Sequence, residues 1–135
     1  MYTSEVKVRV RYSETDRMGY VYYGNYASYF EVARVEALRD IGMPYLRMEE
    51  EGFLLPVLDY KVRYLKPAYY DDLLLIKTTI LQLPSVKIIF SYEVFGENGQ
   101  KLNEAETTLV FINKESGKPC KAPQELLMKL KPFFS

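Results

Sequence analysis

The sequence contains no histidine, no tryptophan and a single cysteine, Cys120, in 135 residues. The absence of histidine excludes a Ser-His or Cys-His pair, a histidine general base and any histidine-ligated metal site. Acid–base chemistry must therefore use carboxylates, tyrosines, lysines or the backbone. One cysteine cannot form an internal disulfide, which fits a reducing compartment.

The sequence also lacks net charge, because its 18 basic residues equal its 18 acidic residues. No overall attraction to nucleic acid is therefore expected, and no nucleic-acid partner is predicted. No apolar run approaches the roughly 20 residues that cross a bilayer. The charged alternation that begins at Glu5 leaves no visible secretory signal, so we expect a cytoplasmic protein without a membrane span. No cofactor and no metal are predicted.

What is present is an ordinary globular composition, with 48% apolar and 27% charged residues. A chain of this length can bury one hydrophobic core. No repeat, linker or low-complexity segment divides it. We therefore predict a single domain over residues 1–135.

The first third of the chain changes from a strand pattern to a helix pattern. Residues 5–12 alternate between apolar and charged side chains, which predicts a half-buried strand whose inner face ends at Tyr12. Residues 25–41 have helical apolar spacing, with Asn25 as the predicted N-cap and Gly42 as the stop. The predicted apolar face of this helix consists of Tyr26, Tyr29, Phe30, Ala33, Ala37 and Ile41.

The remainder reads mostly as strands, and Asn98-Gly99 marks a tight hairpin turn. Strands are predicted at 53–65, 73–81, 86–95 and 101–113, and short helices at 44–51 and 123–130. Short connections between these four strands favour an antiparallel meander.

The long helix and the strands have comparable predicted lengths, about 25 Å for the helix and about 33 Å for a ten-residue strand. The economical arrangement is an α+β fold in which a curved antiparallel sheet wraps around one long central helix. The other sheet face and the sheet edges would remain exposed. We therefore expect a homo-oligomer, because oligomerisation covers such surfaces.

Residues 14–26, ETDRMGYVYYGNY, place one aspartate beside several tyrosines immediately before the predicted helix. Asp16 has two interpretations, a turn residue or a chemical group. The tyrosines have two as well, because helical apolar stripes usually pack in a core, whereas flat phenol rings also form pocket walls.

This stretch resembles the 4-hydroxybenzoyl-CoA thioesterase family of the hot-dog fold. The resemblance extends through the segments at 64–74 and 102–113, and the order of elements also agrees. The matching positions of the stretch are Asp16, Gly19, Val21, Tyr22, Tyr23, Asn25 and Tyr26.

The resemblance implies an acyl-CoA thioesterase with its site at a dimer interface, often within a homotetramer. Asp16 matches the catalytic aspartate, acting as nucleophile or general base, and Tyr23 marks the helix N-terminal N–H that polarises the thioester carbonyl. Free N–H groups at a helix start suit that task chemically. The substrate-binding positions are Gly19, Tyr22, Gly24, Asn25 and Tyr26.

A basic cluster of Lys61, Arg63 and Lys66 is either a solvated strand face or a contact for the CoA phosphates. Some relatives carry a basic-basic-serine run on a middle strand, but this sequence has only Ser85 and Lys87 there. An acyl carrier protein thioester therefore stays open as the substrate.

Two other functions compete with hydrolysis. The first is a non-catalytic module that binds acyl-CoA or acyl carrier protein thioesters, which the presence of Asp16 opposes. The second is a hot-dog dehydratase, which ranks low because that chemistry resembles reactions that use a histidine.

Overall fold

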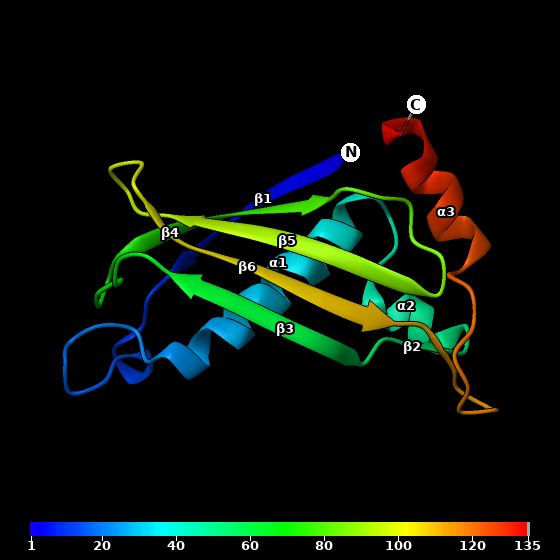
Figure 1. Ribbon diagram of the computed structural model, residues 1–135, viewed down its shortest axis with the longest axis horizontal. Helices are drawn as coiled ribbons and strands as arrows, with labels where there is room; N and C mark the ends of the chain where they lie inside the picture. The colour runs from blue at the N-terminus through cyan, green and yellow to red at the C-terminus, as the bar shows by residue number, and fades with distance from the viewer. Residues whose placement is uncertain (135) are drawn as a thin grey trace.

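The computed structural model describes residues 1–134 and consists of one curved antiparallel sheet with a long helix across its concave face (Figure 1). The sheet has five strands in the order β1-β4-β5-β6-β3. The strands are β1 Tyr2–Arg9, β3 Val57–Tyr64, β4 Leu73–Ile80, β5 Lys87–Phe95 and β6 Lys101–Val110, and the long helix is α1 Tyr26–Asp40. The predicted α+β architecture is confirmed.

Helix α1 buries the predicted face against the sheet. Tyr26, Tyr29, Phe30, Ala33 and Ala37 are at most 3% exposed, whereas the predicted member Ile41 is only partly buried. Their partners are the alternate residues of each strand, since successive strand side chains point to opposite faces. One such inner-face row runs across the sheet through Val6, Ile76, Val94, Asn103 and Tyr64.

The predicted four-strand meander is wrong at its first step. Strands β4, β5 and β6 do form a meander, but β3 pairs with β6 rather than with β4. The reason is that each strand has two edges, and β1 pairs along the whole of β4. With β5 on the other side of β4, the outer edges of β1 and β6 remain, and β3 pairs with β6. Residues 65–72 carry the chain across the end of the sheet.

The first strand ends earlier than its alternation predicts. Strand β1 stops at Arg9, and Tyr12 lies in a 3₁₀ turn with 77% of its surface exposed, so its predicted inner position is wrong. The turn forms because the Arg11 N–H donates to the Glu14 carboxylate at 2.8 Å, which bends the chain away from the sheet. The loop and the start of α1 then lie at one end of the molecule (Figure 1).

The opposite end is closed by two short helices, α2 Tyr45–Glu50 and α3 Gln124–Leu130, and by a small ladder. The ladder pairs β2 Phe53–Leu54 with β7 Ile112–Asn113, so the strand predicted at 101–113 is interrupted after Val110. Gly42 ends α1 with φ of +82°, a conformation that favours glycine. Within residues 1–134, no helix has both the length and the apolar character needed to span a membrane.

Candidate active site

Asp16 lies in a tight turn that its own side chain helps to form. The Gly19 N–H donates to the Asp16 carbonyl at 3.0 Å, and the Met18 N–H donates to Asp16 Oδ1 at 2.9 Å. Gly19 has φ of +85°, so the turn requires a residue that tolerates the left-handed region. One carboxylate oxygen thus holds the turn. The other accepts no hydrogen bond from the residues that the structure describes.

A cavity of about 280 Å³ lies beside this turn. Tyr23 and Tyr26 from the start of α1 face it together with Asp16, and Tyr64 and Lys66 approach from the end of β3. Asp16 itself is exposed within one chain, because no element covers the outer side of the turn. The lining residues are Asp16, Tyr20, Val21, Tyr23, Tyr26, Tyr64, Leu65, Lys66 and Pro67.

The first turn of the central helix leaves backbone donors free. Residues Tyr23–Asn25 form a 3₁₀ turn that continues directly into α1. The Asn25 N–H donates to Tyr22 O at 2.9 Å, and the Tyr26 N–H donates to Tyr23 O. The N–H groups of Tyr23 and Gly24 find no acceptor within residues 1–134, as expected for the first donors of a helical segment. Of these two residues, Tyr23 lines the cavity.

The predicted N-cap role of Asn25 is wrong. Its side chain makes no capping hydrogen bond, and its backbone is already helical with φ of −75° and ψ of −18°. The 3₁₀ turn moves the start of the helical path back to Tyr22, so Asn25 lies inside it. The Asn25 Nδ2 instead donates to the Glu14 carbonyl at 2.8 Å and ties the helix to the loop.

Glu14 joins the Asp16 loop to α1, a role that sequence reasoning missed. Its carbonyl accepts the Tyr22 N–H at 2.9 Å as well as the Asn25 amide, and its carboxylate accepts the Tyr29 hydroxyl at 2.8 Å. Burial opposes ionisation, but hydrogen bonds from Arg11 and Tyr29 outweigh it and lower the pKa of Glu14. The sequence places Arg11 and Glu14 three residues apart, a spacing at which opposite charges can pair. No signal connected them to Tyr29.

The tyrosines of the stretch divide into buried and exposed members. Tyr26 is 3% exposed, and burial raises its pKa to about 12, so the hydroxyl stays protonated. Tyr22 and Tyr23 are exposed, with ring centroids 4.7 Å apart. A Cβ on Gly24 would lie 2.6 Å from Tyr22 Cε2, so this glycine makes room for the Tyr22 ring. Within one chain Tyr23 lines the cavity, and Tyr22 does not.

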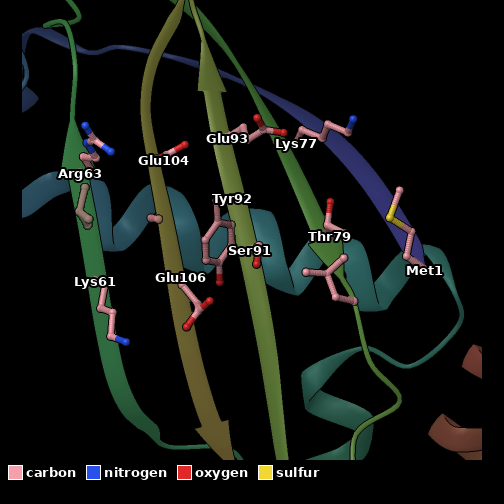
Figure 2. Close-up of a pocket in the computed structure, with 13 residues that line it drawn as sticks. Met1, Lys61, Arg63, Lys77, Thr79, Ser91, Tyr92, Glu93, Glu104 and Glu106 are labelled. Atoms are coloured by element: carbon pink, nitrogen blue, oxygen red, sulfur yellow. The ribbon is translucent and has the colours of Figure 1, made fainter.

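The structure separates the predicted basic cluster. Lys66 lies at the cavity beside Asp16 and donates to Gln100 Oε1 at 3.1 Å. Lys61 and Arg63 lie on the outer, convex face of the sheet, in a shallow groove of about 570 Å³ (Figure 2). There they stand directly across from Glu106 and Glu104 on β6, which places anions beside both cations.

Neither a metal site nor a cysteine lies at the Asp16 cavity among residues 1–134. Residues 1–134 hold no group of three or more histidine, cysteine, aspartate or glutamate side chains that could bind a metal ion. Cys120 is a partly buried free thiol in the segment after β7, outside the Asp16 cavity.

Comparison with known proteins shows the family of the chain. Residues 10–130 match the family model of the thioesterase-like superfamily. The acyl-CoA thioester hydrolase YbgC of Escherichia coli is 32% identical over 124 residues, which cover 92% of each chain.

Solved structures give the same result. A DHNA-CoA thioesterase from Staphylococcus aureus superposes with a TM-score of 0.86 at 34% identity, covering 99% of this chain and 85% of that one. A mutant 4-hydroxybenzoyl-CoA thioesterase in complex with 4-hydroxybenzoyl-CoA has the same fold, with a TM-score of 0.86 at 20% identity over 96% of this chain and 99% of that one. The chain therefore belongs to the thioesterase-like superfamily and has the hot-dog fold of these enzymes.

Proposed function

We propose that this enzyme hydrolyses acyl-CoA thioesters to a free carboxylic acid and CoA. The observation that carries the proposal is the shared cavity. Asp16 lines it from the loop, and Tyr23, whose backbone N–H has no acceptor within residues 1–134, lines it from the start of α1. A carboxylate and an unpaired N–H donor are the two groups that thioester hydrolysis needs.

The two groups divide the reaction between them. The Tyr23 N–H binds the thioester oxygen and stabilises the negative charge that develops on it, helped by the positive end of the helix dipole. Asp16 acts in one of two ways. As a general base it takes a proton from the water that attacks the carbonyl carbon. As a nucleophile it forms a mixed anhydride, which water then hydrolyses. In both routes the CoA thiolate leaves and takes up a proton.

The residues proposed to bind the substrate lie in the same segment as Asp16 and Tyr23. Gly19 and Gly24 shape the turn and the helix start, Asn25 holds the two together, and Tyr22 and Tyr26 offer flat ring surfaces. Lys66 is the basic residue beside the cavity and is therefore the preferred phosphate contact. For Lys61 and Arg63 a phosphate contact stays a prediction, which their acidic neighbours on β6 oppose.

The proposed enzyme is a homo-oligomer, as a dimer or a tetramer, with the site at a dimer interface. Edge strand β3 supports this because one of its backbone edges is unpaired and carries the exposed apolar side chains Leu58, Tyr60 and Tyr64. Tyr64 also lines the Asp16 cavity. A second chain on this edge would cover the exposed aspartate. The cytoplasmic location stays a prediction, supported by the single cysteine.

A non-catalytic acyl-thioester module is the second candidate function. It is favoured by the turn that Asp16 Oδ1 stabilises, because this hydrogen bond gives the aspartate a structural reason to be present. Such a module would bind acyl-CoA or acyl carrier protein esters without releasing a thiol.

A thiol-release assay on a panel of acyl-CoA and acyl carrier protein esters separates these functions. We expect turnover of CoA esters by the wild type and a fall in kcat of about 10²–10⁴-fold in Asp16→Asn, which removes the base or nucleophile. Asn still accepts the Met18 N–H, so the turn survives. Asp71→Asn is the matched control, because Asp71 is also an exposed loop aspartate and its φ of 68° suits Asn. Wild-type turnover by Asp16→Asn would refute the catalytic assignment.

A further inference from the structure

Asn103 is a buried polar side chain that the proposed reaction does not use. It lies near the start of β6, on the inner face of the sheet, and is 0% exposed. Its Nδ2 and Oδ1 atoms are both buried and form no hydrogen bond within residues 1–134. An amide without such bonds destabilises a core, so its presence needs an explanation. Because the chain itself encloses both atoms, a second chain on edge strand β3 cannot reach them.

The position of Asn103 places its side chain directly behind the Asp16 cavity. Asn103 is opposite Tyr64 in the pairing of β6 with β3, and both side chains point to the inner face. The N–H groups of Leu65 and Lys66 donate at 2.9 Å to the carbonyl that precedes Asn103 in β6. Tyr64, Leu65 and Lys66 all line the Asp16 cavity. The amide is therefore a polar group of the core just inside the wall of that cavity.

Tyr26 lies between this amide and the cavity. Its ring centroid is 5.7 Å from that of Tyr64, whose hydroxyl donates to Tyr23 O at 3.4 Å. Side chains of a helix lean toward its N-terminus, so the Tyr26 ring lies back toward the turn that carries the unpaired Tyr23 N–H. Tyr26 lines the cavity although it is only 3% exposed. Its hydroxyl forms no hydrogen bond within residues 1–134 and, unlike the Asn103 amide, is not fully buried.

The Asn103 side chain acts on the Tyr26 hydroxyl. Burial raises the pKa of Tyr26 to about 12, Tyr64 adds to the rise, and the Asn103 side chain opposes it. An N–H group that faces a phenol oxygen has this effect, because it favours the negatively charged form. The contact is looser than a formed hydrogen bond, since none of standard geometry joins the two side chains. With an amide N–H directed at its oxygen, the phenol keeps its own proton for an acceptor in the cavity.

We propose that the Tyr26 hydroxyl is a second donor to the thioester carbonyl oxygen, beside the Tyr23 N–H, and that Asn103 is the positioning residue that directs its proton into the cavity. The proposal rests on the thioesterase function proposed above and assigns two further residues to that reaction. The carbonyl oxygen is the acceptor because every acyl thioester brings it to the site. The negative charge that develops on this oxygen in the transition state strengthens both hydrogen bonds.

A purely structural role for Asn103 predicts a different effect on stability. If the amide served the fold, its removal would lower the free energy of unfolding. If it serves the reaction, Asn103→Leu should fold at least as stably as the wild type, because an apolar side chain replaces an unpaired polar one. Thr78 supplies the matched control. Its Oγ1 is also buried and unpaired within residues 1–134, on the inner face of β4 and outside the Asp16 cavity.

The first experiment measures urea midpoints and kcat on the same variants, with the best ester of the acyl-CoA panel. Tyr26→Phe should lower kcat by about 10²-fold, the usual effect of deleting one donor to the developing oxyanion. Asn103→Leu should lower kcat by about tenfold, because the hydroxyl remains but its proton is no longer directed. The double variant should be no slower than Tyr26→Phe alone, since both residues act through one hydroxyl. Thr78→Val should have the wild-type kcat and a urea midpoint that is unchanged or higher.

Two results of this experiment would overturn the proposal. Wild-type kcat in Asn103→Leu, whatever its urea midpoint, would leave Asn103 with a structural role only. Additive losses in the double variant would show that the amide does not act through Tyr26. Asn103→Ala, which removes the amide without adding volume, replaces Asn103→Leu if the larger side chain prevents folding.

The second experiment needs no turnover. S-(2-oxooctyl)-CoA, labelled with ¹³C at its ketone carbon, presents a carbonyl group that cannot be hydrolysed, and hydrogen-bond donors move the resonance of such a carbon downfield. We expect a downfield shift on binding to the wild type, a smaller one in Tyr26→Phe and an intermediate one in Asn103→Leu. Equal shifts in the wild type and Tyr26→Phe would refute the second donor. A wild-type shift that Tyr26→Phe reduces, without thiol release from any ester, would refute the proposed hydrolysis and leave the two donors in place.

Discussion

The two ends of helix α1 differ in how their backbone polar groups are paired. At the C-terminal end, backbone groups are paired with the backbone and with side chains. The Met43 N–H donates to Leu38 O at 2.9 Å, and the Gly42 carbonyl accepts both Arg47 Nη1 at 3.2 Å and Lys129 Nζ at 3.3 Å. Beneath this end lies an apolar core in which Leu38, Met43, Met48, Leu126 and Leu130 are 0% exposed.

At the N-terminal end the donors are left open. The Tyr23 and Gly24 N–H groups lack acceptors within residues 1–134, Asn25 caps nothing, and Tyr22 and Tyr23 are exposed. Unpaired groups cost free energy when they are buried, which is why helix ends are normally capped. The contrast teaches that one helix serves as an anchor at one end and as a binding site at the other. Four predictions test this division, beginning with the largest expected effect.

Removing one open donor should damage catalysis more than any loss of side chain at the same position. Tyr23→Pro deletes the N–H, and proline is accepted at the first position of a helix. Tyr22 already has φ of −62° and ψ of 129°, a conformation that a following proline favours. We expect kcat to fall by about 10²–10³-fold with an unchanged unfolding midpoint. Tyr23→Ala, which keeps the N–H, is the control. Equal losses in both variants would move the role from the backbone to the phenol ring.

Changing the anchored end should affect stability instead. Gly42→Ala places a Cβ at φ of +82° and 2.7 Å from Lys129 Nζ, so both the backbone and that ammonium group must shift. We expect a loss of about 1–2 kcal/mol in the free energy of unfolding, the usual cost of a left-handed non-glycine residue. Urea titration measures the loss, and kcat of the folded fraction should be unchanged. A fall in kcat without a fall in stability would contradict the division between the two ends.

The hydrogen bonds of the Glu14 carboxylate should make the free energy of unfolding depend on pH in the acid range. Because the pKa of Glu14 is lowered in the folded state, its contribution to stability is present above the ordinary value of 4.5 and is lost as the pH falls through the lower folded value. Glu14→Gln removes that contribution, which we expect to be about 1 kcal/mol. Urea midpoints measured from pH 6 downward should converge for the two proteins in acid. Parallel curves at all pH values would show that Glu14 does not titrate with folding.

The smallest effect should come from the surface ion pair at the anchored end. Arg47 Nη2 lies 2.6 Å from Glu125 Oε1, but both side chains are more than a third exposed. Solvent screens such pairs, so Arg47→Ala should cost less than about 1 kcal/mol. A double-mutant cycle with Glu125→Ala isolates the coupling free energy. A coupling well above that value would mean that the charged surface, and not the apolar core, holds this end together.

Local patterns in the sequence predicted most of the elements. Alternation located strands β1 and β3, an apolar run located β4, helical spacing located α1 and most of its buried face, and Asn98-Gly99 marked the hairpin between β5 and β6. Gly42 was correctly predicted to end α1. These features succeed because each depends on residues within a few positions of one another.

Features that depend on distant residues were not predicted. The pairing of β3 with β6 follows from β1 taking the edge of β4, more than sixty residues away in the sequence. The Asn25 cap failed because the Glu14 carbonyl, eleven residues earlier, binds its side chain. The bond from Tyr29 to Glu14 and the buried Arg34 beside Tyr45 were likewise outside the reach of local spacing.

The sequence by itself determined the α+β class, the long central helix, the family and the identity of Asp16 and Tyr23 as the candidate pair. These follow from the local order of apolar and turn-forming residues and from a short segment of matching side chains. Tertiary structure alone decided which polar side chains remote in sequence become partners. That outcome depends on the distances between segments remote in sequence, and it is these distances that pair Glu14 with Tyr29, tie Asn25 to the Glu14 carbonyl and place Arg34 beside Tyr45.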